Sequence, residues 1–296
     1  MSHLLAAIDI GSNAARLLIS RASWNNEHVD LQKQNLVRVP LRLGKDVYHS
    51  GKISAERSEM FLDTMQAYKH LLNIYKPENF AVCATAAMRE AKNGIALLQQ
   101  VRQYTGMEVK LIDGLEEARL IRNTGKIQPR EGYDFTMFLD VGGGSTEISV
   151  LTGAGLVAEE SFPLGTLREI SGLEYEQSKH RMAAWLKQFQ DFYGKIHLIG
   201  SGGNINKLVK LYGDIKNRLI SFNELCTALQ QLENMDVSER MSRFNLREDR
   251  ADVIVPAARI FKEIMQQVQA DFTEAPKIGV ADGLITDLFL SMEKNS

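Results

Sequence analysis

Short apolar runs alternate with longer helical patterns along the first half of this chain. Strands are predicted where apolar and β-branched residues cluster between polar turns, at residues 4–10, 15–21, 29–38, 79–84 and 108–112. Helices are predicted where apolar positions recur with helical spacing, at residues 54–75, 86–104 and 115–124. Ser54 is a favourable N-cap for the first of these helices. This order predicts a mixed sheet covered by helices, which is an α/β fold.

The same pattern starts again after a polar connector. Residues 125–134 contain glycine, proline and charged residues, a composition typical of a link between domains. Beyond it we expect strands at residues 135–140, 147–151, 156–163 and 195–200. Helices are expected at residues 174–193, after Asn204, and at 222–234, 237–242, 249–269 and 281–292. We therefore predict two related domains, residues 1–125 and 126–280, with a cleft between them. The segment 281–296 is a candidate to pack back on the first domain.

Composition places the chain among ordinary globular enzymes. It has 296 residues, of which 44% are hydrophobic and 24% charged, values that suit two well-packed domains. The net charge of −2 does not identify a partner, because charges more than about 8 Å apart are screened at cellular salt. Cys83 and Cys226 lie in apolar settings without metal-ligand or redox spacing. The sequence shows neither a signal-like leader nor about 18 consecutive apolar residues, so we expect a cytoplasmic protein without membrane contact.

Two glycine turns carry the main chemical signal. Each follows an apolar run and an aspartate, Asp9 in the first case and Asp140 in the second, and each leads back into a strand. Glycines let successive backbone N–H groups point into one concavity, which binds anions. Arg16 adds a planar guanidinium that suits phosphate. We predict two loops that grip a phosphate chain, with the candidate residues Gly11, Ser12, Asn13, Arg16, Gly142, Gly143, Gly144, Ser145 and Thr146. The alternative for the first turn is a plain hairpin with a surface arginine.

Three acids stand beside these turns. Asp9, Asp140 and Glu147 would repel a phosphate unless a cation lay between them, so they are candidate ligands of Mg²⁺ or Mn²⁺. The alternative is that an acid here only orients its turn through an Asx-type hydrogen bond. Neither turn is a P-loop, because no Gly-Lys-Ser/Thr follows, and neither precedes the helix of a dinucleotide fold.

A third glycine element, Gly200-Ser201-Gly202-Gly203-Asn204, lies between a predicted strand and a predicted helix. A helix N-terminus after glycines can hold an anion or a ribose, and Gly202 is the candidate contact. The alternative is a tight strand-to-helix turn without a ligand.

Glu117 is the candidate general base. It shares an apolar helix face with Leu120 and Ile121, whereas Glu116 pairs more naturally with Arg119 toward solvent. A half-buried carboxylate has a raised pKa, which suits a base that works near neutral pH. The alternative is a helix-start carboxylate stabilised by the macrodipole.

Other basic residues could act on a phosphoryl group. Arg89 is expected in the first turn of a helix capped by Thr85, where its guanidinium would neutralise developing charge. The extended stretch with Arg38, Arg42 and Lys45 could steer a polyanion. Either could equally be a solvated surface feature.

Five blocks together resemble the exopolyphosphatase/guanosine pentaphosphate phosphohydrolase (Ppx/GppA) family. They begin at Asp9, Ala84, Gly114, Asp140 and Arg250, and read DIGSNAARL, ATAAMREA, GLEEARLI, DVGGGSTE and RADVI. The resemblance implies two ribonuclease H-like domains of the actin/sugar-kinase/Hsp70-like class. The chain also resembles the short form of the family, which lacks a C-terminal HD-type helical domain.

The resemblance also implies roles for single residues. The family's catalytic base falls on Glu117 and its cleft arginine on Arg89, while Asp140 and Glu147 fall on acids tied to metal and catalysis. Its two phosphate loops fall on residues 11–16 and 142–146. Ala14 departs from the family pattern, which has a serine there, and so removes one hydroxyl donor.

The expected activity is hydrolysis of terminal phosphoanhydride bonds of inorganic polyphosphate, with a divalent metal. Hydrolysis of the 5′-terminal phosphate of guanosine pentaphosphate is the close alternative. An ATP-using kinase or ATPase and a non-catalytic sensor of alarmone or polyphosphate are alternatives of other classes. The expected partner is one of these phosphate compounds and not a nucleic-acid polymer, and the oligomeric state, a homodimer included, is left open.

Overall fold

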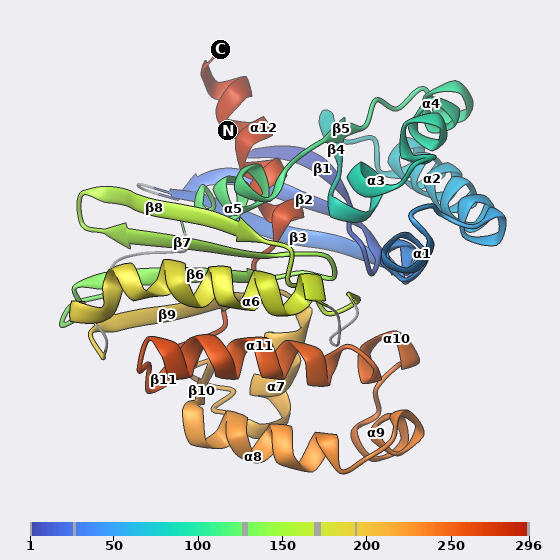
Figure 1. The fold of residues 1–296 in the computed structure, drawn as a ribbon. Coiled ribbons are helices and arrows are strands. Elements are labelled where there is room, and N and C mark those ends of the chain that lie inside the picture. The colour runs from blue at the N-terminus through green and yellow to red at the C-terminus, as the bar shows by residue number, and fades with distance from the viewer. Residues whose placement is uncertain (1, 26–27, 126–129, 169–172, 193, 295–296) are drawn as a thin grey trace. The chain divides into compact units, whose positions relative to one another are not determined.

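The structure is a computed structural model that describes residues 2–25, 28–125, 130–168, 173–192 and 194–294. The chain divides into two compact units, unit 1 with Met1–Lys126 and Ile278–Ser296, and unit 2 with Ile127–Lys277. Part of the predicted connector, residues 126–129, lies outside the described residues. Each unit is a sheet with helices packed against it (Figure 1).

Unit 1 is built on a five-stranded mixed sheet. Its strands, in the order β3-β2-β1-β4-β5, are β3 (His28–Val39), β2 (Ala15–Asn25), β1 (Ser2–Ile10), β4 (Asn79–Ala84) and β5 (Lys110–Leu111). β1, β2 and β3 are antiparallel neighbours, while β4 runs parallel to β1 and β5 parallel to β4. The helices are α1 (Leu43–Ser50), α2 (Ala55–Tyr75), α3 (Ala86–Glu90), α4 (Gly94–Thr105), α5 (Gly114–Arg122) and α12 (Val280–Lys294).

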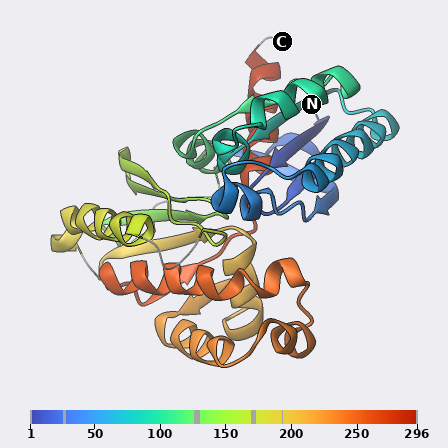
Figure 2. The same ribbon diagram turned by 45° about the vertical axis from the view of Figure 1, so that its right-hand side comes forward.

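The core of unit 1 lies between the sheet and helices α2 and α4. Apolar residues of β1 and β2 alternate between the two faces, so that Ala6, Ile8 and Ile10 face the cluster that contains Phe61 and Val101. Helix α12 contacts β1, β2 and α5 (Figure 2). The chain segment after residue 278 therefore completes unit 1.

Unit 2 repeats this plan with one strand more. Its sheet has the order β10-β11-β9-β6-β7-β8, with β10 (Leu219–Ser221), β11 (Phe272–Glu274), β9 (Ile196–Ser201), β6 (Phe135–Val141), β7 (Thr146–Thr152) and β8 (Gly155–Phe162). β6, β7 and β8 are antiparallel neighbours, and β9 runs parallel to β6. The helical segments are α6 (Leu173–Leu186), the 3₁₀ helix η1 (Lys187–Phe192), α7 (Gly203–Tyr212), α8 (Phe222–Glu233), α9 (Val237–Phe244), α10 (Glu248–Ala251) and α11 (Ile254–Gln267).

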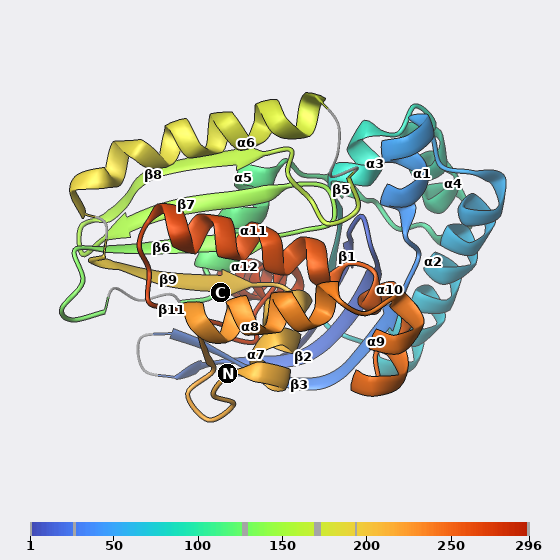
Figure 3. The same ribbon diagram turned by 60° about the horizontal axis from the view of Figure 1, so that its bottom comes forward.

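Helices α6, α7, α8 and α11 bury one apolar cluster against the sheet of unit 2 (Figure 3). Both units have three antiparallel strands followed by a strand parallel to the first, the arrangement expected of the ribonuclease H-like domains that the resemblance implies. The expected α/β fold, with two mixed sheets flanked by helices, is confirmed. No helix in the described part of the chain combines the length and the apolar character that crossing a bilayer requires.

Several predicted elements differ from the structure. The single helix expected at residues 86–104 is two helices, α3 and α4. The break lies at Asn93, whose side chain binds the backbone of Ile53. Asn93 Oδ1 accepts from Ile53 N at 2.9 Å, and its Nδ2 donates to Ile53 O at 2.8 Å. Helix α1 lies where an extended stretch was expected, and the three-residue strands β10 and β11 were not predicted. The helix expected at residues 249–269 is broken into α10 and α11.

Candidate functional site

The first glycine loop, which joins β1 to β2, is held by the backbone of residues 42–44. The Ser12 carbonyl accepts a hydrogen bond from Gly44 N at 2.8 Å, and the Asn13 carbonyl accepts from Arg42 N at 3.0 Å. In a planar trans peptide the C=O and N–H point in opposite directions. The N–H groups of Asn13 and Ala14 therefore point away from residues 42–44. Two successive amides directed to one side form the start of an anion nest.

Side chains of this loop already have partners inside unit 1. The Ser12 hydroxyl is buried and lies 2.8 Å from the Tyr48 hydroxyl. Arg16 Nη1 donates to Asp9 Oδ2 at 2.8 Å, so the predicted metal ligand and the predicted phosphate ligand form one ion pair. Asp9 is buried, and the guanidinium neutralises it. The backbone amides are therefore the clearest anion-binding feature of this loop.

The second glycine loop, which joins β6 to β7, is held in the same way by the segment after β8. Three consecutive loop carbonyls accept hydrogen bonds there: Gly142 from Thr166 N at 3.0 Å, Gly143 from Leu167 N at 2.9 Å, and Gly144 from Arg168 Nε at 2.5 Å. By the same peptide geometry, the N–H groups of residues 143–145 all point away from this segment. Three successive amides directed to one side make a deeper anion nest than in the first loop.

We call residues 42–44 and 164–168 the straps. Each segment donates hydrogen bonds to the carbonyls of one glycine loop. The two straps act at equivalent places: Ser12 lies three residues after Asp9, Gly143 lies three residues after Asp140, and both carbonyls accept from a strap amide. Gly165 lets the second strap approach closely. A Cβ at Gly165 would lie 2.4 Å from the Gly143 carbonyl oxygen.

Asp140 and Glu147 lie directly opposite each other on β6 and β7. Both are buried, with 9% and 1% of their surfaces exposed, and one carboxylate oxygen of each lies within 4.8 Å of the other. Two buried carboxylates at this distance repel unless a cation or a proton lies between them. Their oxygens suit a hard divalent cation, so these two residues fit the predicted metal site.

Glu117 lies on α5, the helix whose first turn was predicted to carry the general base. Asp113 caps this helix by accepting a hydrogen bond from Glu116 N at 2.8 Å. Glu116 pairs with Arg119 at 2.8 Å, as predicted, and this hydrogen bond lowers the pKa of Glu116 from 4.5 to about 2. Glu117 is buried on the face of α5 that carries Leu120 and Ile121, also as predicted. Its role as base stays a prediction.

The remaining candidates are Arg89 and Gly202. Arg89 lies in the last turn of the short helix α3 rather than in a first turn, and its Nη1 donates to the Ile112 carbonyl at 2.6 Å. Gly202 is the N-cap residue of α7 and has a φ of 98°, which favours glycine. A Cβ there would lie 3.7 Å from Asp140 Oδ1, so the third glycine loop adjoins Asp140 within unit 2.

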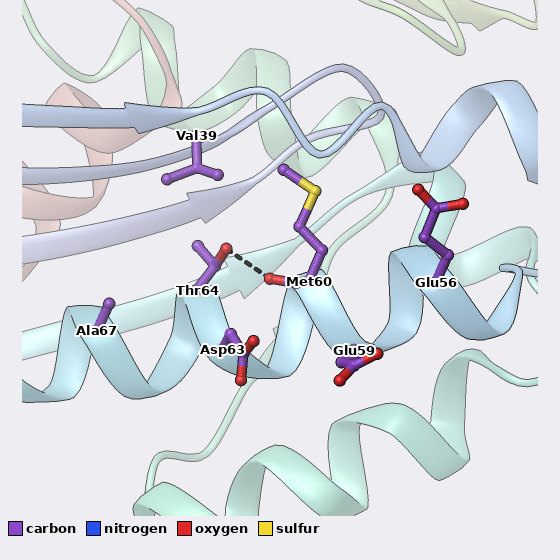
Figure 4. Close-up of a pocket in the computed structure, with 7 residues that line it drawn as sticks. All are labelled: Val39, Glu56, Glu59, Met60, Asp63, Thr64 and Ala67. Carbon is purple, nitrogen blue, oxygen red and sulfur yellow. Dashed lines mark hydrogen bonds between the residues drawn. The ribbon is translucent and has the colours of Figure 1, made fainter.

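A pocket elsewhere in unit 1 does not coincide with these residues. It has a volume of about 450 Å³ and is lined by Val39, Glu56, Glu59, Met60, Asp63, Thr64 and Ala67 (Figure 4). All but Val39 belong to α2. Three carboxylates around it would repel a phosphate, so it is not the site of a phosphate compound.

Comparison with known proteins identifies the family. A model described as the Ppx/GppA phosphatase family matches residues 30–292. The chain belongs to the Ppx/GppA phosphatase family. Curated relatives include a bifunctional 3-dehydroquinate synthase/phosphatase of Fusobacterium nucleatum, 27% identical over 299 residues that cover 92% of this chain and 44% of the relative. A guanosine-5′-triphosphate,3′-diphosphate pyrophosphatase of Vibrio campbellii is 23% identical, and the match covers 99% of this chain and 61% of that relative. The chain thus spans about half the length of these two relatives.

Solved structures of Ppx/GppA proteins share the fold. An Aquifex aeolicus family member matches with a TM-score of 0.76 at 23% identity, covering 99% of each chain. A structure described as an exopolyphosphatase from Cytophaga hutchinsonii matches with a TM-score of 0.82 at 21% identity, covering 97% of this chain and 98% of that one. The resemblance to the Ppx/GppA family seen in the sequence is therefore confirmed, and so is the fold that it implies.

Proposed function

We propose that this protein hydrolyses the terminal phosphoanhydride bonds of inorganic polyphosphate and releases orthophosphate. The observation that carries the proposal is the end of the unit 2 sheet, where three successive loop amides point to one side beside two buried carboxylates. The amides suit a phosphate group, and the carboxylates suit a divalent cation. Membership of a phosphatase family supports the same reaction.

The reaction assigns each candidate one task. The amides of residues 143–145 in unit 2 bind oxygens of the terminal phosphate and hold it for in-line attack. In unit 1 the amides of Asn13 and Ala14 are suited to bind phosphate oxygens as well. Glu117 accepts a proton from water as the new O–P bond forms. The bond from phosphorus to the bridging oxygen breaks, and the shortened chain leaves with its electron pair. Arg89 offsets charge that develops on the transferred group.

Asp140 and Glu147 would hold Mg²⁺ or Mn²⁺. The ion supplies charge neutralisation for the phosphate oxygens when it is bound. Asp9 is the least suited of the three predicted metal ligands, because Arg16 already neutralises its charge. Gly202 and the N-terminus of α7, which adjoin Asp140, suit a further anionic group of the same substrate.

One variant pair tests the proposed base. Glu117→Gln is expected to abolish phosphate release from polyphosphate while polyphosphate binding, measured by calorimetry, remains. Glu116→Gln is the matched control, because it makes the same chemical change on the neighbouring residue of α5. It is expected to keep near wild-type turnover. Wild-type phosphate release by Glu117→Gln would show that another group takes the proton.

A second candidate substrate is guanosine pentaphosphate. The name of the Vibrio campbellii relative and the α7 N-terminus beside Asp140 favour it. Phosphate release from polyphosphate and from guanosine pentaphosphate, compared at one Mg²⁺ concentration, separates the two. Tight binding of either compound without turnover would instead indicate a sensor, a reading that Ala14 supports because it lacks the hydroxyl. ADP formation from ATP would point to the kinase or ATPase class.

A further inference from the structure

Four polar residues lie side by side across four neighbouring strands of unit 2. The register pairs Ser201 of β9 with Asp140 of β6, Asp140 with Glu147 of β7, and Glu147 with Ser161 of β8. Residues paired in this way have side chains on the same face of the sheet. We call this line Ser201-Asp140-Glu147-Ser161 the acid row.

Each acid of the row accepts a hydrogen bond from the serine beside it in the row. Ser161 Oγ donates to Glu147 Oε1 at 2.8 Å, and Ser201 Oγ donates to Asp140 Oδ1. Ser201 and Glu147 are almost completely buried, at 1% exposure each. The backbone of Ser161 is fixed in turn, because its carbonyl accepts from Arg181 Nη2 at 2.9 Å. Both hydroxyls are thus placed by the strands that flank β6 and β7.

The equivalent row of unit 1 is built differently. There the register pairs Asp9 with Cys83 on one side and Arg16 on the other, and Arg16 with Arg38. The acid of unit 1 thus finds its cation within the chain, as the 2.8 Å contact with Arg16 shows. The acid row of unit 2 carries two carboxylates, and its four residues include no basic side chain. Unit 2 is the half that suits a cation from outside.

We propose that Ser161 and Ser201 are positioning residues that hold Asp140 and Glu147 in the arrangement that binds the divalent cation. The inference rests on the metal site of the proposed function. A donor on one oxygen of a ligating carboxylate fixes the rotation of the group, and such outer partners typically change metal affinity by about 10–100-fold. Because each serine serves one acid, loss of either hydroxyl leaves one ligand free to rotate out of the site.

The test measures metal binding without substrate. Mn²⁺ binding to the metal-free protein is followed by electron paramagnetic resonance, for the wild type and for Ser161→Ala and Ser201→Ala. Each alanine variant is expected to bind Mn²⁺ about 10–100-fold more weakly. Ser161→Thr and Ser201→Thr keep the hydroxyl and are expected to restore binding to near the wild-type value. Circular dichroism and melting temperature confirm that each variant is folded.

Ser149→Ala is the matched control. Ser149 is a fully buried serine on β7, two residues from Glu147 and on the same face of the sheet, and its register partner is also a glutamate, Glu159. It lies one row away from the two acids, so its loss is expected to leave Mn²⁺ affinity unchanged. An equal loss of affinity in this variant would show a general effect on the sheet and would overturn the inference.

The outcomes separate this inference from the proposed reaction. Unchanged Mn²⁺ affinity in both alanine variants, or no Mn²⁺ binding by the wild type, overturns the positioning role. Weakened binding in those variants supports it even where neither polyphosphate nor guanosine pentaphosphate is hydrolysed, in which case the proposed reaction alone fails. Failure of the threonine variants to restore binding in a folded protein also counts against it.

Discussion

Gly165 is where the second strap presses on its loop, and Gly165→Ala is the sharpest probe of that contact. An added Cβ would lie 2.4 Å from the Gly143 carbonyl oxygen, 2.4 Å from the Gly144 carbonyl carbon and 2.5 Å from the Gly143 carbonyl carbon. All three atoms belong to the backbone, so a side-chain rotation cannot relieve the clash. The φ of Gly165 lies outside the left-handed region, so alanine meets no conformational strain of its own there. The variant therefore reports on the contact alone.

The size of the effect follows from these distances. Ordinary contact begins near 3.4 Å, so strap and loop must separate by about 1 Å. A strained contact of this kind costs about 1–3 kcal/mol of the free energy of unfolding. A shift of about 1 Å in groups that position a substrate can lower the rate about 100-fold. Because the strap fixes the direction of the loop amides, we expect the loss in kcat/KM to exceed what the loss of stability explains.

The assay compares two glycines of unit 2. Urea unfolding and phosphate release from polyphosphate are measured for Gly165→Ala and for the control Gly153→Ala, whose added Cβ would meet no atom within 4 Å. The control is expected to keep wild-type activity. Wild-type kcat/KM in a folded Gly165→Ala protein would refute the idea that the strap holds the loop amides in place.

Three further changes test the packing of unit 1. Tyr68→Phe removes a buried hydroxyl whose one proton is shared between two backbone carbonyl oxygens, at 3.0 and 3.2 Å. Urea unfolding should show a loss of about 1–3 kcal/mol in the free energy of unfolding, and no loss would contradict this expectation. Gly283→Ala would place a Cβ 2.1 Å from the Leu120 carbonyl oxygen, so α12 and α5 must separate, and a melting temperature equal to that of the wild type would show that they need not. The Arg119 hydrogen bond lowers the pKa of Glu116 from 4.5 to about 2, so its stabilisation is complete above pH 4.5 and is lost as the pH falls toward 2. Glu116→Gln should flatten this part of the stability profile, and an unchanged slope would rule out the pair as its cause.

The elements that sequence predicts well here have strong and uninterrupted patterns. Strand β4 occupies residues 79–84 as predicted, and α2 follows the expected cap, with Ser54 Oγ accepting from Arg57 N at 3.3 Å. The break between α3 and α4 escaped prediction because it depends on Asn93 reaching Ile53, 40 residues away. Such a contact leaves no trace in local periodicity.

The candidate site likewise has parts that the sequence predicts and parts that it does not. Glycine turns with an aspartate in front are visible in sequence, because they need particular residues. The straps are not visible, because nearly all their bonds to the loops use backbone N–H groups that any residue except proline could donate. Ser161 and Ser201 were missed for another reason: serines in strands are common, and only the register shows that they flank Asp140 and Glu147. Gly165 gave no signal beyond a single glycine after a strand.

Hydrogen bonds from a strap to loop carbonyls fix the backbone of a glycine loop without involving the side chains of that loop. Residues 12–14 can change identity while their peptide planes keep the same tilt, because the strap contacts only the carbonyl oxygens of Ser12 and Asn13. Ala14 illustrates this freedom, because it carries no polar side chain and the adjoining peptide groups stay anchored. Substitution at these positions can therefore change ligand preference while the fold stays the same.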